Sequence, residues 1–165
     1  MFDSISPTSG QVLASFAEIS PADLNDKLDA AVRAQRAWAK SPITARSELL
    51  RRIAGVLRGD VPQWANLISL EMGKPIAESE AEILKCAWCC DFYADNAERF
   101  LEPEMAPSAA TESYIVLDPL GVVLAIMPWN FPFWQFFRFA APAIAAGNGM
   151  VLKHASNVPQ CAGHR

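Results

Sequence analysis

The residues that could do chemistry in this 165-residue chain lie mainly in its last third. Asn130 follows the apolar run Val122–Ile126 and comes shortly before Pro132, so it falls in a turn between an expected strand and an expected helix. The turn at the carboxyl end of a buried strand is where ligands bind in open α/β sheets, so Asn130 is a candidate binding residue. The alternative is that Asn130 caps the helix that begins at Pro132.

Two isolated cations follow this turn. Lys153 ends a second short strand, where it can reach the hydroxyl or phosphate groups of a ribose, or extend into water. Arg138 is the only charged residue between Asp118 and Lys153. By helical spacing it shares one face with Phe131 and Trp134, so its guanidinium could bind a carboxylate through two parallel hydrogen bonds. Extension into solvent, or an ion pair with an acid elsewhere, is the alternative for Arg138.

Three cysteines, Cys86, Cys89 and Cys90, lie close together in an expected helix. Zinc normally needs four ligands at defined spacing, and the two histidines of the chain do not complete such a pattern. We therefore expect the three thiols to pack as small apolar side chains, and we expect no metal site. The fourth cysteine, Cys161, has no evident base partner and is not expected to be a nucleophile.

The elements that must position these residues fall into two groups. Up to residue 111 the apolar spacing is helical, and capping residues predict helices from Ser20-Pro21, from about Thr44, from Asp60 to Gly73, and from Pro75 to about Phe100. Beyond this point the pattern predicts a strand at Ser113–Leu117, a turn, the buried strand Val122–Ile126, a helix from Pro132 to Gly147, and the strand Gly149–Lys153.

This order predicts an α/β fold in which amino-terminal helices lead into an incomplete Rossmann-like parallel sheet. We expect residues 1–111 to form the amino-terminal helical part of a cofactor-binding domain, 112–121 a strand and turn, and 122–165 the first βαβ unit. A doubly wound sheet needs several such units, and one is present. No G-x-G-x-x-G pattern follows the strand, so the usual glycine-turn argument for binding a pyrophosphate does not apply.

The composition is that of a globular chain, with 52% hydrophobic residues, a net charge of −4 and a pI near 5.2. This charge gives no basic surface for nucleic acid or for an anionic membrane, so neither is expected as a partner. The uncharged run 119–137 is long enough for a membrane span, but Pro128, Asn130 and Pro132 interrupt it. Without a secretory signal or a spaced disulfide framework, the chain is expected to be cytoplasmic.

Four segments occur in the order and at the spacing of the aldehyde dehydrogenase superfamily. They are Leu70-Glu71-Met72-Gly73-Lys74-Pro75, Pro119-Leu120-Gly121-Val122, Pro128-Trp129-Asn130-Phe131-Pro132, and Ala146-Gly147-Asn148 with Val151-Leu152-Lys153. The chain therefore resembles that superfamily over nearly its whole length. Within it, Lys153-His154-Ala155-Ser156 and its surroundings resemble the bacterial NAD(P)-dependent succinate-semialdehyde dehydrogenases.

The resemblance implies where a nicotinamide cofactor and a small aldehyde substrate bind. The expected cofactor contacts are Ile126, Met127, Pro128, Trp129, Asn130, Lys153, His154, Ala155 and Ser156. Asn130 is also expected to stabilise the oxyanion that forms when a cysteine adds to the aldehyde. Because Ser156 stands where many NAD-preferring members carry a glutamate, a 2′-phosphate is not repelled, and NADP or NAD is expected. Arg138 and Phe131 are expected to contact the substrate, Arg138 through the carboxylate of succinate semialdehyde.

In the superfamily, catalysis also needs a thiolate nucleophile and a glutamate that activates water, and the resemblance places both beyond Arg165. We therefore expect the chain to be an amino-terminal part of a dehydrogenase, inactive alone, whose full-length form is a homo-oligomer. The alternative is a non-enzymatic interaction protein that pairs with full-length chains through its helices or through the strand at 113–117.

Overall fold

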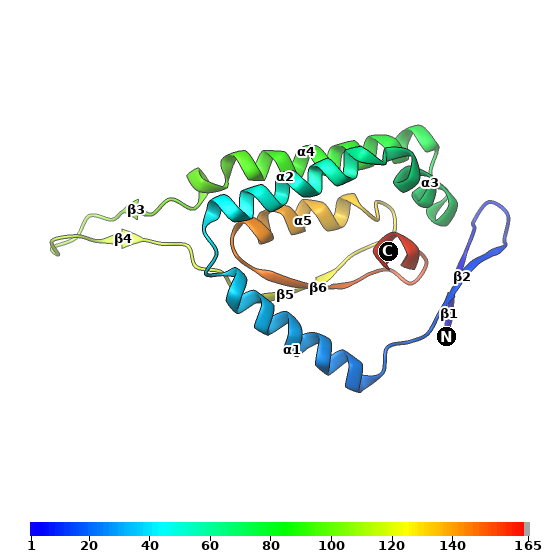
Figure 1. Cartoon of the computed structure of the whole chain (residues 1–165), viewed down its shortest axis with the longest axis horizontal. Coiled ribbons are helices and arrows are strands. Elements are labelled where there is room, and N and C mark those ends of the chain that lie inside the picture. The colour runs from blue at the N-terminus through cyan, green and yellow to red at the C-terminus, as the bar shows by residue number, and fades with distance from the viewer. Residues whose placement is uncertain (164–165) are drawn as a thin grey trace.

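The computed structural model describes residues 1–163, in which two long helices, α2 and α4, lie over helix α5, and α5 lies over a small parallel sheet (Figure 1). The helices are α1 (Pro21–Trp38), α2 (Ile43–Gly59), α3 (Val61–Met72), α4 (Ile76–Phe100), α5 (Trp134–Ala145) and α6 (Pro159–Gly163). The strands are β1 (Phe2–Ile5), β2 (Val12–Phe16), β3 (Glu104–Met105), β4 (Tyr114–Ile115), β5 (Val122–Ile126) and β6 (Gly149–Lys153). The predicted α/β fold is confirmed.

The helix boundaries follow the capping residues in the sequence. Ser20 begins α1, its Oγ accepting a hydrogen bond from the Asp23 backbone N–H at 3.1 Å. The Asp60 carboxylate caps α3 in the same way, with its Oδ1 3.2 Å from the Gln63 nitrogen. Gly73 ends α3 with a φ of 83°, a left-handed conformation that glycine adopts without strain. These predicted boundaries are confirmed.

The hydrophobic core lies where α2, α3, α4 and α5 meet. Ion pairs from Arg51 to Asp95 and from Arg58 to Asp91 show that α2 and α4 pack antiparallel, since the pairing order reverses along the two helices. The buried apolar side chains of this core include Leu50, Leu57, Ile68, Ile83, Cys86, Cys90, Ala141 and Ala145. No helix within residues 1–163 is long and apolar enough to cross a membrane.

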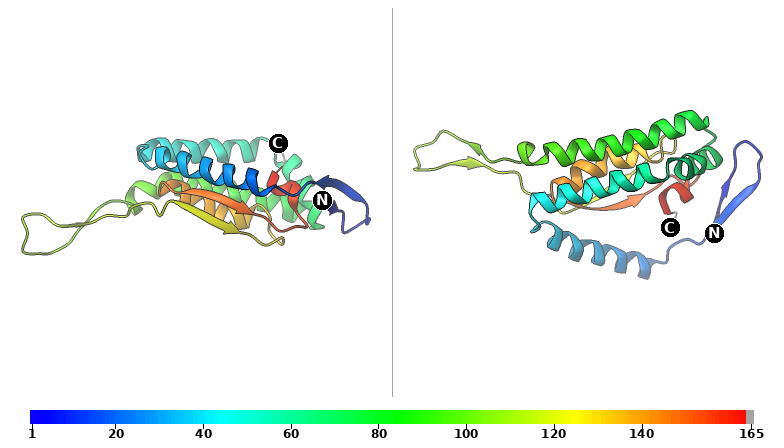
Figure 2. Two further views of the ribbon diagram at one scale, coloured as in Figure 1. Left: turned by 90° about the horizontal axis from the view of Figure 1, so that it is seen from below. Right: turned by 45° about the horizontal axis from the view of Figure 1, so that its top comes forward.

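Strands β5 and β6 form the predicted parallel pair, with α5 as their crossover and α1 on the opposite face of the sheet (Figures 1 and 2). The prediction that β5 is buried on both faces is wrong. Ala125 is buried, but Leu124 and Ile126 are 61% and 69% exposed. Helix α1 lies chiefly against β6, so within residues 1–163 the side of β5 that carries Leu124 and Ile126 is left largely uncovered. Residues 164 and 165, which belong to the predicted unit 122–165, lie outside the described residues.

A narrow arm projects from the helical layer beyond the end of α4 (Figures 1 and 2). It is an antiparallel pair in which Glu104 faces Ile115 and Met105 faces Tyr114. The strand predicted at 113–117 is therefore shorter than expected, because its partner β3 pairs with it over Tyr114 and Ile115 alone in the described residues. The predicted division at residue 112 falls within this arm.

Two elements were not anticipated from the sequence. Strands β1 and β2 form an antiparallel hairpin in which the rings of Phe2 and Phe16 stack at 5.7 Å. The short helix α6 follows β6 and lies near α3, at the same end of the molecule as the hairpin (Figure 1). The side chains of Ser4 and Gln160 join these two segments through a hydrogen bond of 3.1 Å.

The carboxyl end of α5 closes in a left-handed turn. Gly147 has a φ of 83°, its N–H donates to the Ile144 carbonyl, and the Asn148 N–H donates to the Ala143 carbonyl. These two bonds make a Schellman motif, which satisfies carbonyl groups that the helix leaves unpaired. Arg46 from α2 donates to the Ala145 carbonyl at 2.9 Å, which ties the same helix end to the layer above.

We expect Gly147→Ala to lower the free energy of unfolding by about 1–2 kcal/mol, because an L residue is strained in the left-handed region. The added Cβ would also lie 2.8 Å from Nη1 of Arg46. Gly55→Ala in α2 is the control: a Cβ there meets no atom within 4 Å. Alanine in a helix interior should raise stability by about 0.5–1 kcal/mol. Urea unfolding measures both changes, and equal midpoints for the two variants would show that the left-handed turn does not require glycine.

Candidate active site

The carboxyl ends of β5 and β6 lie side by side and bring several of the predicted cofactor residues together. Ile126 faces Lys153 in the register of the pair, and the Met127 N–H donates to the Lys153 carbonyl at 3.1 Å. Met127 and Pro128 then lie beside His154 and Ala155, around a gap of only about 10 Å³, close to the least volume that can hold one water. The two loops that leave the sheet are therefore in direct contact.

The second loop presents a free cation. Lys153 and Ser156 are exposed, and within residues 1–163 the Lys153 side chain forms no hydrogen bond or ion pair. His154 differs, because its Nδ1 lies 2.8 Å from the Ala155 carbonyl oxygen and its ring lies 6.3 Å from the Phe2 ring. Lys153 can therefore reach a ligand, whereas His154 packs against the β1–β2 hairpin.

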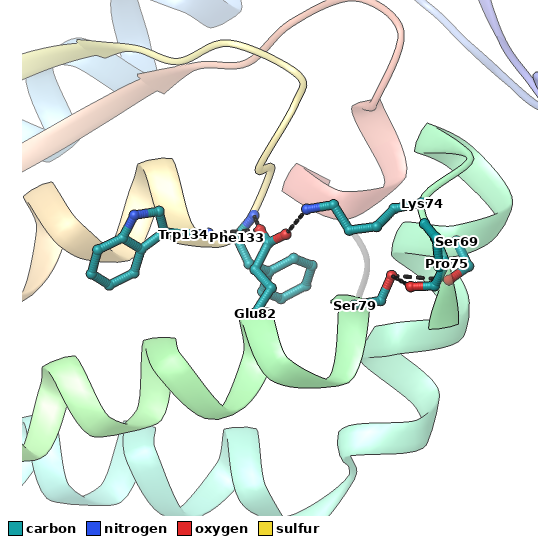
Figure 3. A network of polar contacts seen from close by, with 7 residues as sticks. All are labelled: Ser69, Lys74, Pro75, Ser79, Glu82, Phe133 and Trp134. Carbon is teal, nitrogen blue, oxygen red and sulfur yellow. Dashed lines mark hydrogen bonds and ion pairs between the residues drawn. The ribbon is translucent and has the colours of Figure 1, made fainter. Parts of the chain in front are cut away.

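Asn130 lies exposed in the turn after β5, and in the described part of the chain its side chain forms no hydrogen bond. The alternative that it caps the following helix is wrong. Helix α5 begins at Trp134 instead of Pro132, and the N–H groups of Phe133 and Trp134 both donate to Oε1 of Glu82, each at 2.9 Å (Figure 3). Because a carboxylate from α4 occupies the cap position, the Asn130 amide is left available.

Glu82 belongs to a buried ion pair. The Lys74 Nζ lies 2.5 Å from Oε2 of Glu82, and the two side chains are only 3% and 1% exposed (Figure 3). The same ammonium lies 3.6 Å from the centre of the Phe131 ring, a favourable cation–π contact. Removing one partner of such a pair typically costs about 3–5 kcal/mol, because the other charge is left buried and uncompensated.

The loop that carries Lys74 is itself held by hydroxyl groups. The Ser79 Oγ donates to the Pro75 carbonyl at 3.4 Å and lies 2.9 Å from the Ser69 Oγ (Figure 3). Ser69 is at the end of α3 and Ser79 is in the first turns of α4. These contacts close the short connection between the two helices, so the direction in which Lys74 points depends on both.

A second buried carboxylate serves the loop after β6. Glu71, 2% exposed, accepts hydrogen bonds at Oε1 from the Ser4 hydroxyl at 2.6 Å and from the Gln160 N–H at 2.9 Å. Its Oε2 accepts from the Cys161 N–H at 2.8 Å. The donors from Gln160 and Cys161 belong to the first turn of α6, where an anion is favourable. Glu71 and Glu82 thus each hold the helix that follows one strand of the sheet.

Neither glutamate is predicted as a site residue from the sequence. A signal was present: Glu82 shares the buried face of α4 with Ser79, Cys86 and Cys90 by helical spacing. A charged residue on the apolar face of a helix requires a buried partner.

The predicted substrate contacts lie along the amino-terminal half of α5. Phe131 and Trp134 border a hollow of about 220 Å³ beside α4, and the Lys85 Nζ lies 4.1 Å from the centre of the Trp134 ring. Arg138 is exposed one turn further along and does not line that hollow. In the described residues it forms no ion pair, so the alternative of an acidic partner is not observed there.

The four thiols do not have the properties of a nucleophile or a metal site. Cys86, Cys89 and Cys90 are buried in α4, as predicted. Burial raises the pKa of the Cys90 thiol to about 12, and burial together with the Glu71 carboxylate raises the pKa of Cys161 above its ordinary range. Residues 1–163 contain no cluster of three metal-ligating side chains.

A parallel strand pair with a crossover helix and converging loops at its carboxyl ends is the arrangement by which open α/β sheets bind ligands. The model of the aldehyde dehydrogenase family matches residues 1–164, and the chain belongs to this family. It is 50% identical over 158 residues to a Synechocystis protein named "probable succinate-semialdehyde dehydrogenase (NADP+)". It is 46% identical over 165 residues to succinate-semialdehyde dehydrogenase (NADP+) 1 of Mycobacterium tuberculosis.

Both matches cover 96% of this chain and 35% of the relative, so the chain spans about a third of the length of these curated relatives. Among solved structures, the succinic semialdehyde dehydrogenase of Streptococcus pyogenes in complex with NADP+ is similar, with a TM-score of 0.93 and 35% identity. That match covers 98% of this chain and 36% of the other. The resemblance inferred from the four sequence segments is confirmed.

We expect the thiols of the folded chain to be alkylated far more slowly than those of the unfolded chain. With its pKa raised from 9.0 to about 12, Cys90 has a thiolate population about a thousand-fold smaller below pH 9. Iodoacetamide labelling followed by peptide mass spectrometry, with and without urea, measures each site. Cys161 gives the sharpest check because it is only partly buried. Labelling of Cys161 at the unfolded rate in the native chain would show that its thiol is not suppressed by the fold.

Proposed function

We propose that this chain supplies the oxyanion site and part of the cofactor site for the NAD(P)-dependent oxidation of an aldehyde to its carboxylic acid. The observation that carries the proposal is Asn130, an exposed amide with no partner in residues 1–163, on a turn anchored by buried groups in a member of this family. The aldehyde and water give the acid and one proton, and the cofactor, when bound, would accept the hydride. Because none of its four thiols is activated, the isolated chain is expected to be inactive.

The cofactor is proposed to lie along Ile126, Met127, Pro128 and Trp129 and over the loop formed by Lys153, His154, Ala155 and Ser156. Within residues 1–163 Lys153 has no ion-pair partner, and no acidic residue occurs among these positions, so the 2′-phosphate of NADP is favoured there. The named Synechocystis and mycobacterial relatives are NADP-dependent by name, which supports the same choice. NAD, which lacks that phosphate, is also compatible with the loop.

The substrate is proposed to be an aldehyde that carries a distal carboxylate, with succinate semialdehyde as the representative. Arg138 would bind the carboxylate, and Phe131 would contact the carbon chain beside Asn130. The Arg138 guanidinium, which has no ion-pair partner in the described part of the chain, lies on an aromatic face of α5 and supports this assignment. The names of the relatives support it independently.

A second candidate function is interaction with other chains of the same kind. The arm exposes Met105 (72%), Tyr114 (50%) and Ile115 (57%), apolar side chains beside unpaired strand edges. We propose that the complete enzyme is a homo-oligomer and that it is cytoplasmic, where its free thiols stay reduced. Light scattering of the purified chain separates the two candidates: a folded monomer favours the enzymatic role, and a chain that is stable only beside a longer partner favours the second.

The direct test joins this chain, in register, to the segment of the Synechocystis relative that lies beyond the matched region. We expect the hybrid to reduce NADP in the presence of succinate semialdehyde. Asn130→Ala should lower kcat by about 10²–10³-fold, as loss of an oxyanion donor does elsewhere, while the thermal unfolding temperature stays unchanged. A hybrid that folds and binds NADP but never oxidises an aldehyde would overturn the proposed function.

Substrate choice provides a separate prediction for Arg138. Arg138→Met in the hybrid should raise the KM for succinate semialdehyde roughly 10- to 100-fold, the value of a charge-assisted hydrogen bond of about 1.5–3 kcal/mol. Butanal, which has no carboxylate, should be oxidised with an unchanged KM. Arg52→Met, at an exposed position on α2, is the control. Equal changes for the two aldehydes would mean that Arg138 does not contact the carboxylate.

A further inference from the structure

We propose that Glu82 is a positioning residue for the oxyanion site: with Lys74, its carboxylate holds the turn that carries Asn130. The inference rests on the proposed function, because it assigns a catalytic purpose to a contact that would otherwise serve only stability. Neither residue reaches the substrate. Both act through the backbone and the ring next to Asn130.

The turn is anchored at points on one side of Asn130. The Phe131 ring, directly after Asn130, lies 3.6 Å from the Lys74 ammonium. The Phe133 and Trp134 N–H groups donate to Oε1 of Glu82 at 2.9 Å each. Asn130 itself forms no side-chain hydrogen bond in residues 1–163, so these contacts and the end of β5 set its place.

The carboxylate has a single arrangement because both of its oxygens are used. Oε1 accepts the two backbone N–H groups, and Oε2 accepts the Lys74 ammonium at 2.5 Å. The pair is almost fully buried, so water does not compete for these positions. The contacts of each carboxylate oxygen therefore restrict the orientation of the other. Through Glu82, the α3–α4 loop is coupled to the first turn of α5 (Figure 3).

The lysine also balances charge. An unpaired carboxylate near Asn130 would oppose the negative charge that develops on the aldehyde oxygen. With Lys74 beside it, Glu82 holds the turn in place without adding net negative charge to the site. Loss of Lys74 should therefore reduce the rate even where the turn remains folded.

The first experiment uses the 165-residue chain alone. Glu82→Ala should increase hydrogen exchange at the Phe133 and Trp134 amides by at least 10-fold and shift the Asn130 side-chain amide signals in the NMR spectrum. Glu80→Gln is the matched control, because Glu80 is exposed on the same helix. Unchanged exchange at both amides in the Glu82→Ala chain would overturn the proposal, whatever the activity of any hybrid.

The second experiment uses the hybrid enzyme. Glu82→Gln, whose amide would face the Lys74 ammonium, should lower kcat about 10- to 100-fold, the usual effect of a displacement of about 1 Å at a reacting group. The KM for NADP should not change. Lys74→Met combined with Glu82→Gln removes the facing ammonium while the Gln carbonyl still accepts both N–H groups, so kcat should recover most of the loss.

A double-mutant cycle distinguishes the positioning role of Glu82 from a merely structural role. In the Asn130→Ala background, Glu82→Gln should cause no further loss of kcat, because its effect passes through Asn130. Additive losses in that cycle would overturn the positioning role. If the unsubstituted hybrid oxidises no aldehyde while the exchange experiment succeeds, the proposed function fails and the anchoring of the turn stands.

Discussion

The carboxylate of Glu82 lies, buried, at the first turn of α5, where the unpaired N–H groups of the helix carry a partial positive charge. At the opposite end of the helix, Arg46, Trp38 and Gln35 donate to the carbonyls of Ala145, Ile144 and Gly147. Helix α5 is thus held by an anion at its positive end and by donors, one of them charged, at its negative end. Its position relative to α1, α2 and α4 is consequently determined by polar contacts as well as by packing.

The same arrangement recurs one strand later. Glu71 accepts the first N–H groups of α6 and the hydroxyl of Ser4, so the loop after β6 is tied to the α3 helix and to the β1–β2 hairpin. Glu71 and Lys74 both come from the segment around Gly73, whose left-handed conformation turns the chain between α3 and α4. Glycine is required there, since an added Cβ would lie 2.8 Å from Cγ of Pro7. One short connection therefore supports both loops at the carboxyl ends of the sheet.

Whether the sequence could predict a feature depends on how far apart in the chain the interacting residues lie. Ser20, Asp60 and Gly73 act within their own helices, and the boundaries they predict are confirmed. The cap of α5 could not be predicted in this way, because its acceptor lies 51 residues earlier in the chain. The neighbouring residues alone therefore indicated Asn130 as the cap and predicted a helix that begins too early, at Pro132. The β1–β2 hairpin and strand β3 were not predicted, and the strand at 113–117 was predicted too long, because strand pairing depends on partners that a local pattern does not identify.

The division between buried and exposed polar groups explains how the site can be both firmly held and accessible. Asn130, Lys153 and Arg138 are exposed, so they remain solvated and cost little folding energy before a ligand binds. The groups that fix the surrounding turns, Glu71, Lys74 and Glu82, are buried and paired, so their geometry is insulated from solvent. An amide donor is effective in catalysis only if its direction is set before the oxyanion forms, since reorientation during the reaction would add to the barrier. In the proposed positioning role, the buried Glu82–Lys74 pair would set that direction through the backbone of the turn, because the Asn130 side chain itself forms no hydrogen bond within residues 1–163.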